Sequence, residues 1–441
     1  MREPPPPSGG PLPRIAWTMT LTDLRWTMRA LAAGAAALPE RWRSGAALNP
    51  IAARMLRNPY PAYARLRERS PVHRSRVLNA WVFTRYADVE AILRDFRRFS
   101  NRPDSVSPDR RRRRSVPPRA DWTMLFLDPP DHTRLRSLVN QAFTPRVVDA
   151  LEPHIRMVMH ELLDAVDDPA GFDLMRAVAG PLPVIVIAEM LGVPPEDRAR
   201  FAEWSHDRAR ILEPLVGARE RARAAAAGEA FDAYFLPIIQ ARRREPRDDI
   251  ISALAQAEEA GDALTERETL TMLRLLLIAG NETTTNLIGN GVLALLEHPE
   301  QLRLLREKPS RIPAAVEELL RFDTPVQLDL RGVVDDCEMH GVRLRRGEPA
   351  VLALGAANRD PEAFDEPDRL DVARSRGSNI SFGRGIHHCL GAPLARLEAR
   401  VALEVLLERY ASLRLIGKRP DFRRAVVLRG LESLPLCAAP A

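Results

Sequence analysis

A cysteine set among glycines is the strongest chemical signal in this sequence. Residues 381–391 read Ser-Phe-Gly-Arg-Gly-Ile-His-His-Cys-Leu-Gly, so Cys389 lies in a run with glycines at positions 383, 385 and 391. Glycine allows unusual backbone dihedral angles and a close approach to a flat ligand. A thiolate is a strong donor to iron, and a helix that begins after the cysteine stabilises the anionic sulfur. We expect that helix over residues 392–407, so the segment indicates a thiolate ligand.

Two other interpretations of the segment stay open on these residues alone. One is a glycine-rich turn that holds a buried free cysteine. The other is a zinc site made by His387, His388 and Cys389. Adjacent residues rarely converge on one metal ion, however, and no second ligand pair with zinc spacing is visible in the sequence.

A second candidate interrupts the most apolar helical pattern of the chain, expected over residues 266–297. The interruption reads Ala-Gly-Asn-Glu-Thr-Thr at positions 279–284. A glycine and an acid inside a buried helix cost stability. Gly280 removes bulk where a flat cofactor could lie, and Glu282 and Thr283 could relay protons. A threonine hydroxyl can instead bond back to a helix carbonyl and bend the helix, so this alternative also stays open.

Two charged pairs have helical spacing. Glu318 and Arg321 stand three residues apart, and His132 and Arg136 stand four apart, so each pair shares one helix face. The first pair alone is a weak signal, because such pairs are usually surface ion pairs. The second pair places two cationic groups together, which suits the carboxylates of a ligand.

The cysteine segment resembles the haem-binding loop of the cytochrome P-450 family, Phe-Gly-x-Gly-x-His-x-Cys-x-Gly. It matches at every fixed position, from Phe382 to Gly391. The resemblance extends from about Asn58 to the end of the chain and is closest to the soluble bacterial class. It implies haem b (iron protoporphyrin IX) as cofactor, and a fold that is mainly α with small β-sheets in a single large domain.

The resemblance also implies a role for each candidate residue. Cys389 would ligate the iron, and the residues expected to bind the haem are His132, Arg136, Ala279, Gly280, Arg331, Phe382, His387, Cys389 and Gly391. Among them His132, Arg136, Arg331 and His387 would hold the propionates. Glu282 and Thr283 match the family's oxygen-activation motif and would be catalytic; Asn281 stands where His is frequent. Glu318 and Arg321, with Arg369 as third member, would form a buried charge network that fixes the cysteine loop.

The implied function is a monooxygenase that inserts one atom of dioxygen into a small apolar organic substrate. Electrons would come from a separate ferredoxin or flavodoxin with its NAD(P)H-dependent reductase. We expect residues 101–121, 275–279, 325–330 and 427–431 to line the substrate pocket. Two alternatives remain, namely a peroxide-driven peroxygenase of the same fold and a non-catalytic haem-binding protein.

Around these motifs the sequence predicts helices and short strands. Helices are expected over residues 60–69 and 87–96, and most of residues 130–320 should be helical. Thr265 and Glu268 form a capping-box pattern before the long apolar helix. A hairpin is expected over residues 71–84, and short strands over residues 332–334, 340–344 and 349–354.

Composition narrows the class of protein. Residues 1–45 are expected to be an N-terminal extension, Pro- and Gly-rich at its start and partly disordered there, and residues 46–441 the haem-thiolate domain. Residues 15–45 read as a helix that packs on the domain surface more often than it contacts a membrane. The chain has net charge +6, and residues 1–120 carry 24 Arg against 9 acids, yet no nucleic-acid-binding signature accompanies them. Three cysteines favour a reducing, cytoplasmic location. The apolar stretches of the chain are too short to span a membrane.

Overall fold

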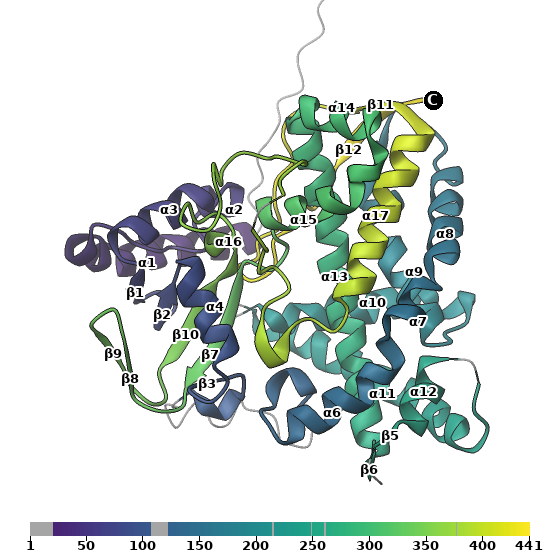
Figure 1. The fold of residues 1–441 in the computed structure, drawn as a ribbon, viewed down its shortest axis with the longest axis horizontal. Coiled ribbons are helices and arrows are strands. Elements are labelled where there is room, and N and C mark those ends of the chain that lie inside the picture. Colours follow the sequence, from purple (N-terminus) through teal and green to yellow (C-terminus); the bar gives the residue numbers. More distant parts are fainter. Residues whose placement is uncertain (1–20, 107–121, 214–215, 248, 260–261, 376) are drawn as a thin grey trace, which may run out of the picture.

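Helices dominate this computed structural model, which describes residues 21–441 except 107–121, 214–215, 248, 260–261 and 376. Figure 1 shows a large helical body on one side and a smaller region built on a β-sheet on the other. The prediction of a mainly α chain with small sheets is confirmed. The Pro-rich start and most of the predicted loop over residues 101–121 lie outside the described residues.

The helical body is built around α13 (Glu266–Glu297), which contacts α9, α10, α11, α15 and α17. The other helices of this body are α6 (Asp131–Asn140), α7 (Pro145–Asp149), α8 (Glu152–Asp164), α9 (Pro181–Met190), α10 (Arg198–Ala209), α11 (Ala218–Arg244), α12 (Ile250–Gln256), α14 (Pro299–Glu307), α15 (Ile312–Phe322) and α17 (Ala392–Arg409). Short helical turns between them are η3 (Met124–Phe126), η4 (Gln141–Phe143), η5 (Met175–Ala179), η6 (Pro195–Asp197), η7 (Arg210–Leu212) and η8 (Pro309–Arg311).

Helix α13 has the predicted bounds, and two reciprocal hydrogen bonds cap its N-terminus. The Thr265 hydroxyl accepts from the Glu268 N–H (3.2 Å), and the Glu268 carboxylate accepts from the Thr265 N–H (2.9 Å). The predicted capping box is therefore confirmed. Between Thr269 and Leu295 every residue is buried except Arg274, Ala279, Gly280 and Thr283. Three of these four exceptions fall in the predicted interruption.

The sheet region holds five strands in the order β1-β2-β10-β7-β3. β10 pairs with β2 in parallel, and the other neighbours are antiparallel. The strands are β1 (Val72–Ser75), β2 (Ala80–Phe83), β3 (Phe99–Ser100), β7 (Leu328–Val333) and β10 (Pro349–Ala353). The elements near them are α1 (Leu21–Ser44), α2 (Ala53–Arg57), α3 (Tyr60–Arg69), α4 (Tyr86–Arg94), η1 (Pro103–Ser105) and α16 (Leu354–Ala357). The hairpin predicted over residues 71–84 is β1 and β2.

Three smaller sheets complete the fold. One has the order β11-β12-β4, and the other two are the hairpins β5-β6 and β8-β9. Their strands are β4 (Phe172–Asp173), β5 (Glu258–Glu259), β6 (Asp262–Ala263), β8 (Cys337–Met339), β9 (Val342–Leu344), β11 (Tyr410–Leu415) and β12 (Pro435–Pro440). The strand predicted over residues 332–334 begins earlier, as β7, because it pairs along its length with β10.

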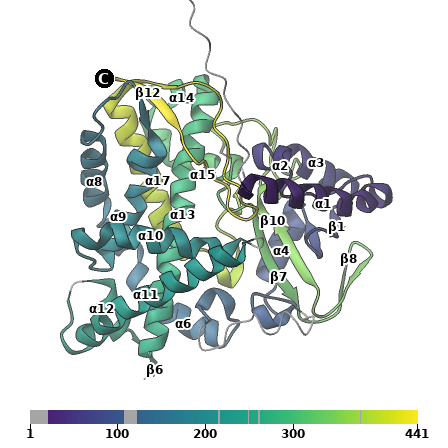
Figure 2. The same ribbon diagram turned by 180° about the vertical axis from the view of Figure 1, so that it is seen from behind.

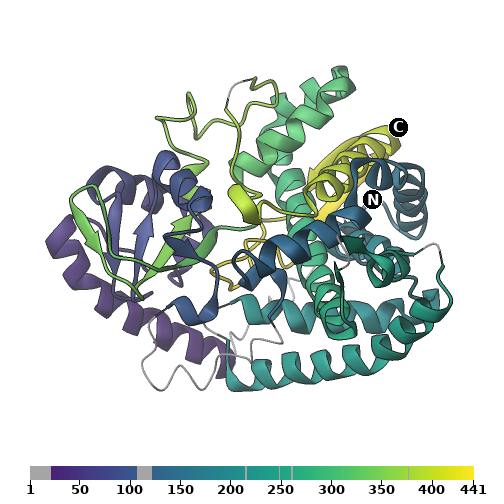
Figure 3. The same ribbon diagram turned by 60° about the horizontal axis from the view of Figure 1, so that its bottom comes forward.

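Helix α1 lies along the outer edge of the sheet region, as Figures 2 and 3 show. Its inward face includes Ala37, which is buried, and Trp26, which packs against the small core of this region. The buried Glu40 carboxylate pairs with the His73 imidazole on β1 (2.9 Å) and accepts from the Leu48 N–H (3.1 Å). The predicted helix over residues 15–45 is thus observed from Leu21 and is docked on the domain surface.

Among the described residues, no helix has both the length and the hydropathy that crossing a bilayer requires.

Candidate active site

Two glycines shape the loop before Cys389. Gly383 and Gly385 both have a φ of 70°, in the left-handed region that other residues rarely adopt. A Cβ on Gly385 would also lie 2.5 Å from the Leu93 carbonyl oxygen near the end of α4. The Cys389 N–H donates to the Phe382 carbonyl oxygen (2.9 Å), which closes the loop. Glycine is therefore required for the turn and for the close approach of α4.

Cys389 lies at the start of α17, where the N–H groups of Gly391 and Ala392 point at its sulfur. Burial raises the pKa of the Cys389 thiol, while these two N–H groups and the guanidiniums of Arg136 and Arg396 lower it; the net direction is upward. The expected help from a helix N-terminus is present. A metal ion in place of the thiol proton would remove the remaining penalty on the thiolate.

One stretch of α13 is open within an otherwise buried helix. Ala279 is exposed, and Gly280 and Thr283 are half-buried. A Cβ built on Gly280 would meet no heavy atom within 4 Å, and the same holds for Gly391 beside the cysteine. These glycines leave room that other residues would reduce, so both positions are suited to a flat group.

A cluster of nitrogen donors lies near the cysteine. The rings of His132 on α6 and His387 in the loop have centroids 4.3 Å apart. The buried His132 Nδ1 and His387 Nε2 atoms have no hydrogen-bond partner among the described residues. Burial lowers the pKa of His387 to about 3, helped by His132, Arg331 and Arg136. Burial and Arg136 also lower the pKa of His132. The cluster gathers donors and positive charge and is short of acceptors.

The two arginines of this cluster differ in their partners. Burial lowers the pKa of Arg136, and only Cys389 opposes this shift. The Arg331 side chain is buried on β7 and already pairs with Asp329 (2.8 Å). Among the described residues, Arg136 therefore has no strong anionic partner, whereas Arg331 shares its charge with Asp329, and both could bind the carboxylates of a ligand. The donors fit the propionates of a haem.

Glu282 and Thr283 point to different partners. The Glu282 carboxylate pairs with His206 on α10 (3.1 Å) and with Arg423. Burial raises the pKa of Glu282, but His206 and Arg423 together lower it below its usual range. The Thr283 hydroxyl donates to the Ala279 carbonyl oxygen (2.7 Å), as the alternative interpretation of this threonine requires. No hydrogen bond between Glu282 and Thr283 is present in the described residues.

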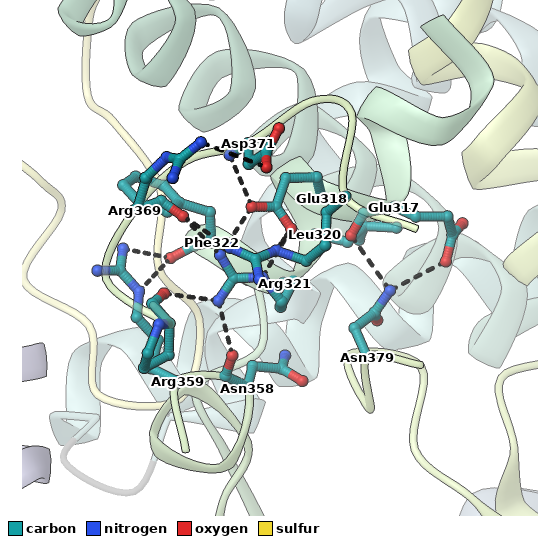
Figure 4. Close-up of polar contacts among 12 residues, drawn as sticks. Glu317, Glu318, Leu320, Arg321, Phe322, Asn358, Arg359, Arg369, Asp371 and Asn379 are labelled. Atoms are coloured by element: carbon teal, nitrogen blue, oxygen red, sulfur yellow. Dashed lines mark hydrogen bonds and ion pairs between the residues drawn. The ribbon is translucent and has the colours of Figure 1, made fainter. Parts of the chain in front are cut away.

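Glu318 and Arg321 form a buried ion pair on α15 (Figure 4). The carboxylate and guanidinium are joined by two hydrogen bonds of 2.7 and 2.8 Å, and both side chains are at most 3% exposed. Arg321 also donates to the carbonyl oxygens of Asn358, Pro367 and Arg369. The predicted buried network is therefore confirmed for these two residues.

The prediction of Arg369 as the third member of this network was wrong. The Arg369 side chain is 56% exposed and pairs with Glu366, and only its backbone carbonyl reaches Arg321. Arg374 takes the predicted place, because its Nε lies 3.0 Å from Glu318 Oε2 and its side chain is 13% exposed. Both arginines belong to one irregular segment, where residue spacing does not decide which side chain turns inward.

Asn358 connects this network to the cysteine loop. Its carbonyl oxygen accepts from Arg321 (3.0 Å), and its Oδ1 accepts from the Ile380 N–H (2.8 Å). The Asn358 amide donates to the Ser381 hydroxyl, which donates to the Leu320 carbonyl oxygen. Sequence reasoning missed Asn358, which stands in no motif. The ion pair, through Asn358, thus holds the segment that leads directly to Phe382.

The zinc interpretation finds no support in the geometry. Within the part of the chain that the structure describes, no three His, Cys, Asp or Glu side chains are grouped to hold a metal ion. His387 faces His132 rather than sharing a site with Cys389 and His388. The residues present fit a flat ligand with anionic groups and an iron that accepts one thiolate.

Known proteins share this sequence and fold. The family model described as Cytochrome P-450 matches residues 206–426. The polyketide biosynthesis cytochrome P-450 PksS of Bacillus subtilis is 41% identical over 391 residues, covering 86% of this chain and 95% of the relative. Its solved structure has a TM-score of 0.82 and covers 89% of this chain and 100% of that chain.

Two further relatives are named for particular substrates. Mycinamicin IV hydroxylase/epoxidase of Micromonospora griseorubida is 44% identical and covers 85% of this chain and 94% of the relative. Vitamin D(3) 25-hydroxylase of Pseudonocardia autotrophica is 43% identical, with 87% and 94% covered.

These similarities define the class: the chain belongs to the cytochrome P-450 family. It is a haem-dependent monooxygenase, an oxidoreductase whose cofactor is haem b, and its relatives are bacterial. Members of this class receive electrons from a ferredoxin and its reductase and act on organic substrates. The resemblance stated from the sequence is therefore confirmed.

Proposed function

We propose that this monooxygenase oxidises a bulky apolar compound, with Cys389 as the axial ligand of the haem iron. One observation carries the assignment of the site. The Cys389 sulfur receives the N–H groups at the start of α17. Nearby, His132 Nδ1 and His387 Nε2 are buried and have no hydrogen-bond partner among the described residues. A thiolate next to unfilled donors for carboxylates is what a haem with propionates requires.

The remaining residue roles are part of this proposal. Bound haem supplies the activation of dioxygen, with electrons delivered by the redox partner. The residues that would position it are His132, Arg136, Arg331 and His387 at the propionates, Ala279 and Gly280 against one face, and Phe382 and Gly391 near the other, with Cys389. The open surface at Ala279 and Gly280 supports this arrangement.

Glu282 and Thr283 would deliver protons from the α13 side. Thr283 Oγ1 donates its proton to Ala279 O, so the lone pairs of Oγ1 can accept a hydrogen bond from a water molecule. The contacts with His206 and Arg423 lower the pKa of Glu282, and this carboxylate can carry a proton inward only after one of the two contacts is released. We propose that Thr283 is the proton-delivering group nearer to the haem. Glu282 would take part only when its contact with His206 or Arg423 opens.

The substrate class follows from the relatives. They are named for polyketide biosynthesis, for mycinamicin IV and for vitamin D(3). Two of these names, mycinamicin IV and vitamin D(3), denote large lipophilic compounds that contain rings, and we propose such a compound here. Residues 325–330, which we predict to line the substrate pocket, include Leu330, an apolar residue that is 53% exposed.

A carbon monoxide difference spectrum of the reduced protein tests the haem-thiolate assignment. Macrolides, secosteroids and steroids would then be screened for shifts of the ferric haem band, followed by product analysis with ferredoxin, reductase and NAD(P)H. Turnover with hydrogen peroxide alone would favour the peroxygenase. Neither spectral shift nor turnover with any donor would favour a non-catalytic haem protein.

We further propose residues 46–441 as the catalytic domain, residues 1–45 as an extension, and the cytoplasm as location. The three cysteines, at positions 337, 389 and 437, are all unpaired, as a reducing compartment requires. A chain that begins at residue 46 should keep the haem spectrum but lose stability, because the Glu40–His73 pair is buried. A truncated protein without the haem spectrum would move the boundary.

A further inference from the structure

The outward face of α1 is apolar and exposed. Met28, Leu31, Leu38 and Trp42 are 61%, 65%, 56% and 89% exposed. The other large hydrophobic side chains that are exposed in the described residues are spread over the fold, among them Met157 on α8 and Ile416 directly after β11. Scattered single hydrophobic residues are normal on a surface, whereas a concentration on one helix marks a contact site.

These residues form one stripe. Positions 28, 31, 35, 38 and 42 recur at steps of three and four, which places them on one side of the helix. Positions 26, 30, 33 and 37 form a second stripe that packs against the domain. At about 100° per residue the two stripes lie on opposite sides. The Glu40–His73 pair fixes the inward side, so the exposed stripe is presented to solvent.

Positive charge borders the exposed stripe. Arg29, Arg41 and Arg43 are exposed, and Glu40, the one acid among residues 26–44, is buried on the other side. At about 100° per residue Arg41 and Arg43 lie about 100° from the middle of the stripe, one on each flank, and Arg29 lies farther round, toward the packed side. A second copy of α1 would bring arginines against arginines, whereas an anionic surface is complementary to them.

We propose that α1 docks this protein on the surface of an anionic lipid bilayer. The helix lies in the plane of the interface, Leu31, Leu38 and Trp42 enter the boundary between headgroups and acyl chains, and the flanking arginines contact lipid phosphates. Tryptophan favours this boundary, and arginine side chains reach from it to the headgroups. Such docking goes beyond the expectation from sequence, in which this helix packs on the domain surface more often than it contacts a membrane.

Vesicle flotation of the full-length, haem-loaded protein tests this proposal. The lipids are phosphatidylcholine alone and phosphatidylcholine with phosphatidylglycerol. The test variant is Leu31→Glu/Leu38→Glu. The matched control is Met157→Glu, which alters a similarly exposed residue on α8, on the side of the molecule away from α1 (Figures 1 and 2). The carbon monoxide spectrum shows that each protein is folded.

Wild type and Met157→Glu should float with the anionic vesicles, less with the neutral ones, and less again as salt is raised. The double variant should lower the bound fraction at least about tenfold. Equal binding of the double variant and wild type would overturn the proposal, as would no binding of wild type to anionic vesicles. A wild-type dimer that the double variant converts to monomer, without vesicle binding, would instead assign the face to a second copy.

Discussion

At the scale of single residues, the chemistry rests on the Cys389 sulfur. Its surroundings are built by backbone groups, since Gly391 and Ala392 supply N–H donors and Gly383 and Gly385 supply the turn. A loop of this kind can be predicted from sequence, because Gly383 and Gly385 have a positive φ that other residues rarely adopt. Roles that depend on side-chain direction, as for Glu282, cannot be predicted in this way.

Cys389→Ser should abolish thiolate ligation. A serine hydroxyl is a harder ligand that stays mostly protonated, so it does not replace the thiolate. The measurement is the band at about 450 nm that reduced haem-thiolate proteins show with carbon monoxide. Cys337→Ser and Cys437→Ser are the controls and should keep the band, since neither residue lies in the glycine-rich loop. Survival of the band in Cys389→Ser would exclude Cys389 as the ligand.

Thr283→Ala should uncouple electron consumption from product formation. Loss of one positioned proton-transfer group typically slows the step it serves by about 10²- to 10⁴-fold. Haem content should not change, because the hydrogen bond that the Thr283 hydroxyl makes within the described part of the chain is to its own helix, at Ala279. NAD(P)H consumed, hydrogen peroxide released and product formed would be measured together.

Thr271→Ala is the matched control for this prediction. Thr271 makes the same kind of bond to its helix, to the Glu268 carbonyl oxygen (2.9 Å), but is buried away from the open stretch of α13. It should change stability and leave coupling as in wild type. If Thr283→Ala forms as much product per NAD(P)H as wild type, the hydroxyl has no part in proton delivery.

At the scale of elements, signals within one segment were predicted and pairings between segments were not. The bounds of α13 follow from the Thr265–Glu268 capping box at its start, so they could be predicted. The start of β7 was missed because its first residues are held by pairing with β10, which the segment itself does not encode. The prediction of Arg369 as the third member of the charge network failed for the same reason.

Arg321→Ala should reduce haem retention more than it alters chemistry. The substitution leaves Glu318 buried with Arg374 as its remaining cation and frees the segment at Asn358 that leads to the cysteine loop. Leaving a buried charge without a partner costs about 3–5 kcal/mol, and this is an upper bound here because Arg374 remains beside Glu318. Haem content and melting temperature of the purified variant are the measurements.

Two further substitutions separate this network from its surroundings. Arg374→Ala should act in the same direction as Arg321→Ala, and more weakly, since it removes one hydrogen bond to Glu318. Arg369→Ala should change neither haem content nor melting temperature, because its side chain is 56% exposed. A loss in Arg369→Ala equal to that in Arg374→Ala would restore Arg369 to the network.

At the scale of the whole molecule, the site exists because distant segments meet. His132 on α6 and His387 in the cysteine loop have ring centroids 4.3 Å apart, and Arg331 comes from a third element. The resemblance to the family identified all three residues. Whether their side chains come close together depends on how α6, β7 and the loop before α17 pack. The docking of α1 through Glu40 and His73 is also a tertiary contact that neither segment predicts.

The stability of the whole molecule should depend on pH through one buried acid on α17. Glu398 is 2% exposed, and its Oε2 has no hydrogen-bond partner among the described residues. Burial raises the pKa of Glu398 to about 8. The folded protein therefore keeps a proton that the unfolded chain releases above its ordinary carboxyl pKa of about 4.5. Stability from this group is complete below the unfolded pKa and is lost as pH rises toward the folded one.

Glu398→Gln should remove this dependence, because the amide has the same shape and no charge to bury. At pH 4 the variant and wild type should melt alike, since Glu398 is protonated in the folded state and largely so in the unfolded one. At pH 7 the variant should be more stable, by up to roughly 3 kcal/mol. Melting of both haem-loaded proteins across this range measures the difference, and the other titrating groups cancel in the comparison. A difference between the two proteins that stays constant with pH would show that Glu398 keeps an ordinary pKa in the folded protein.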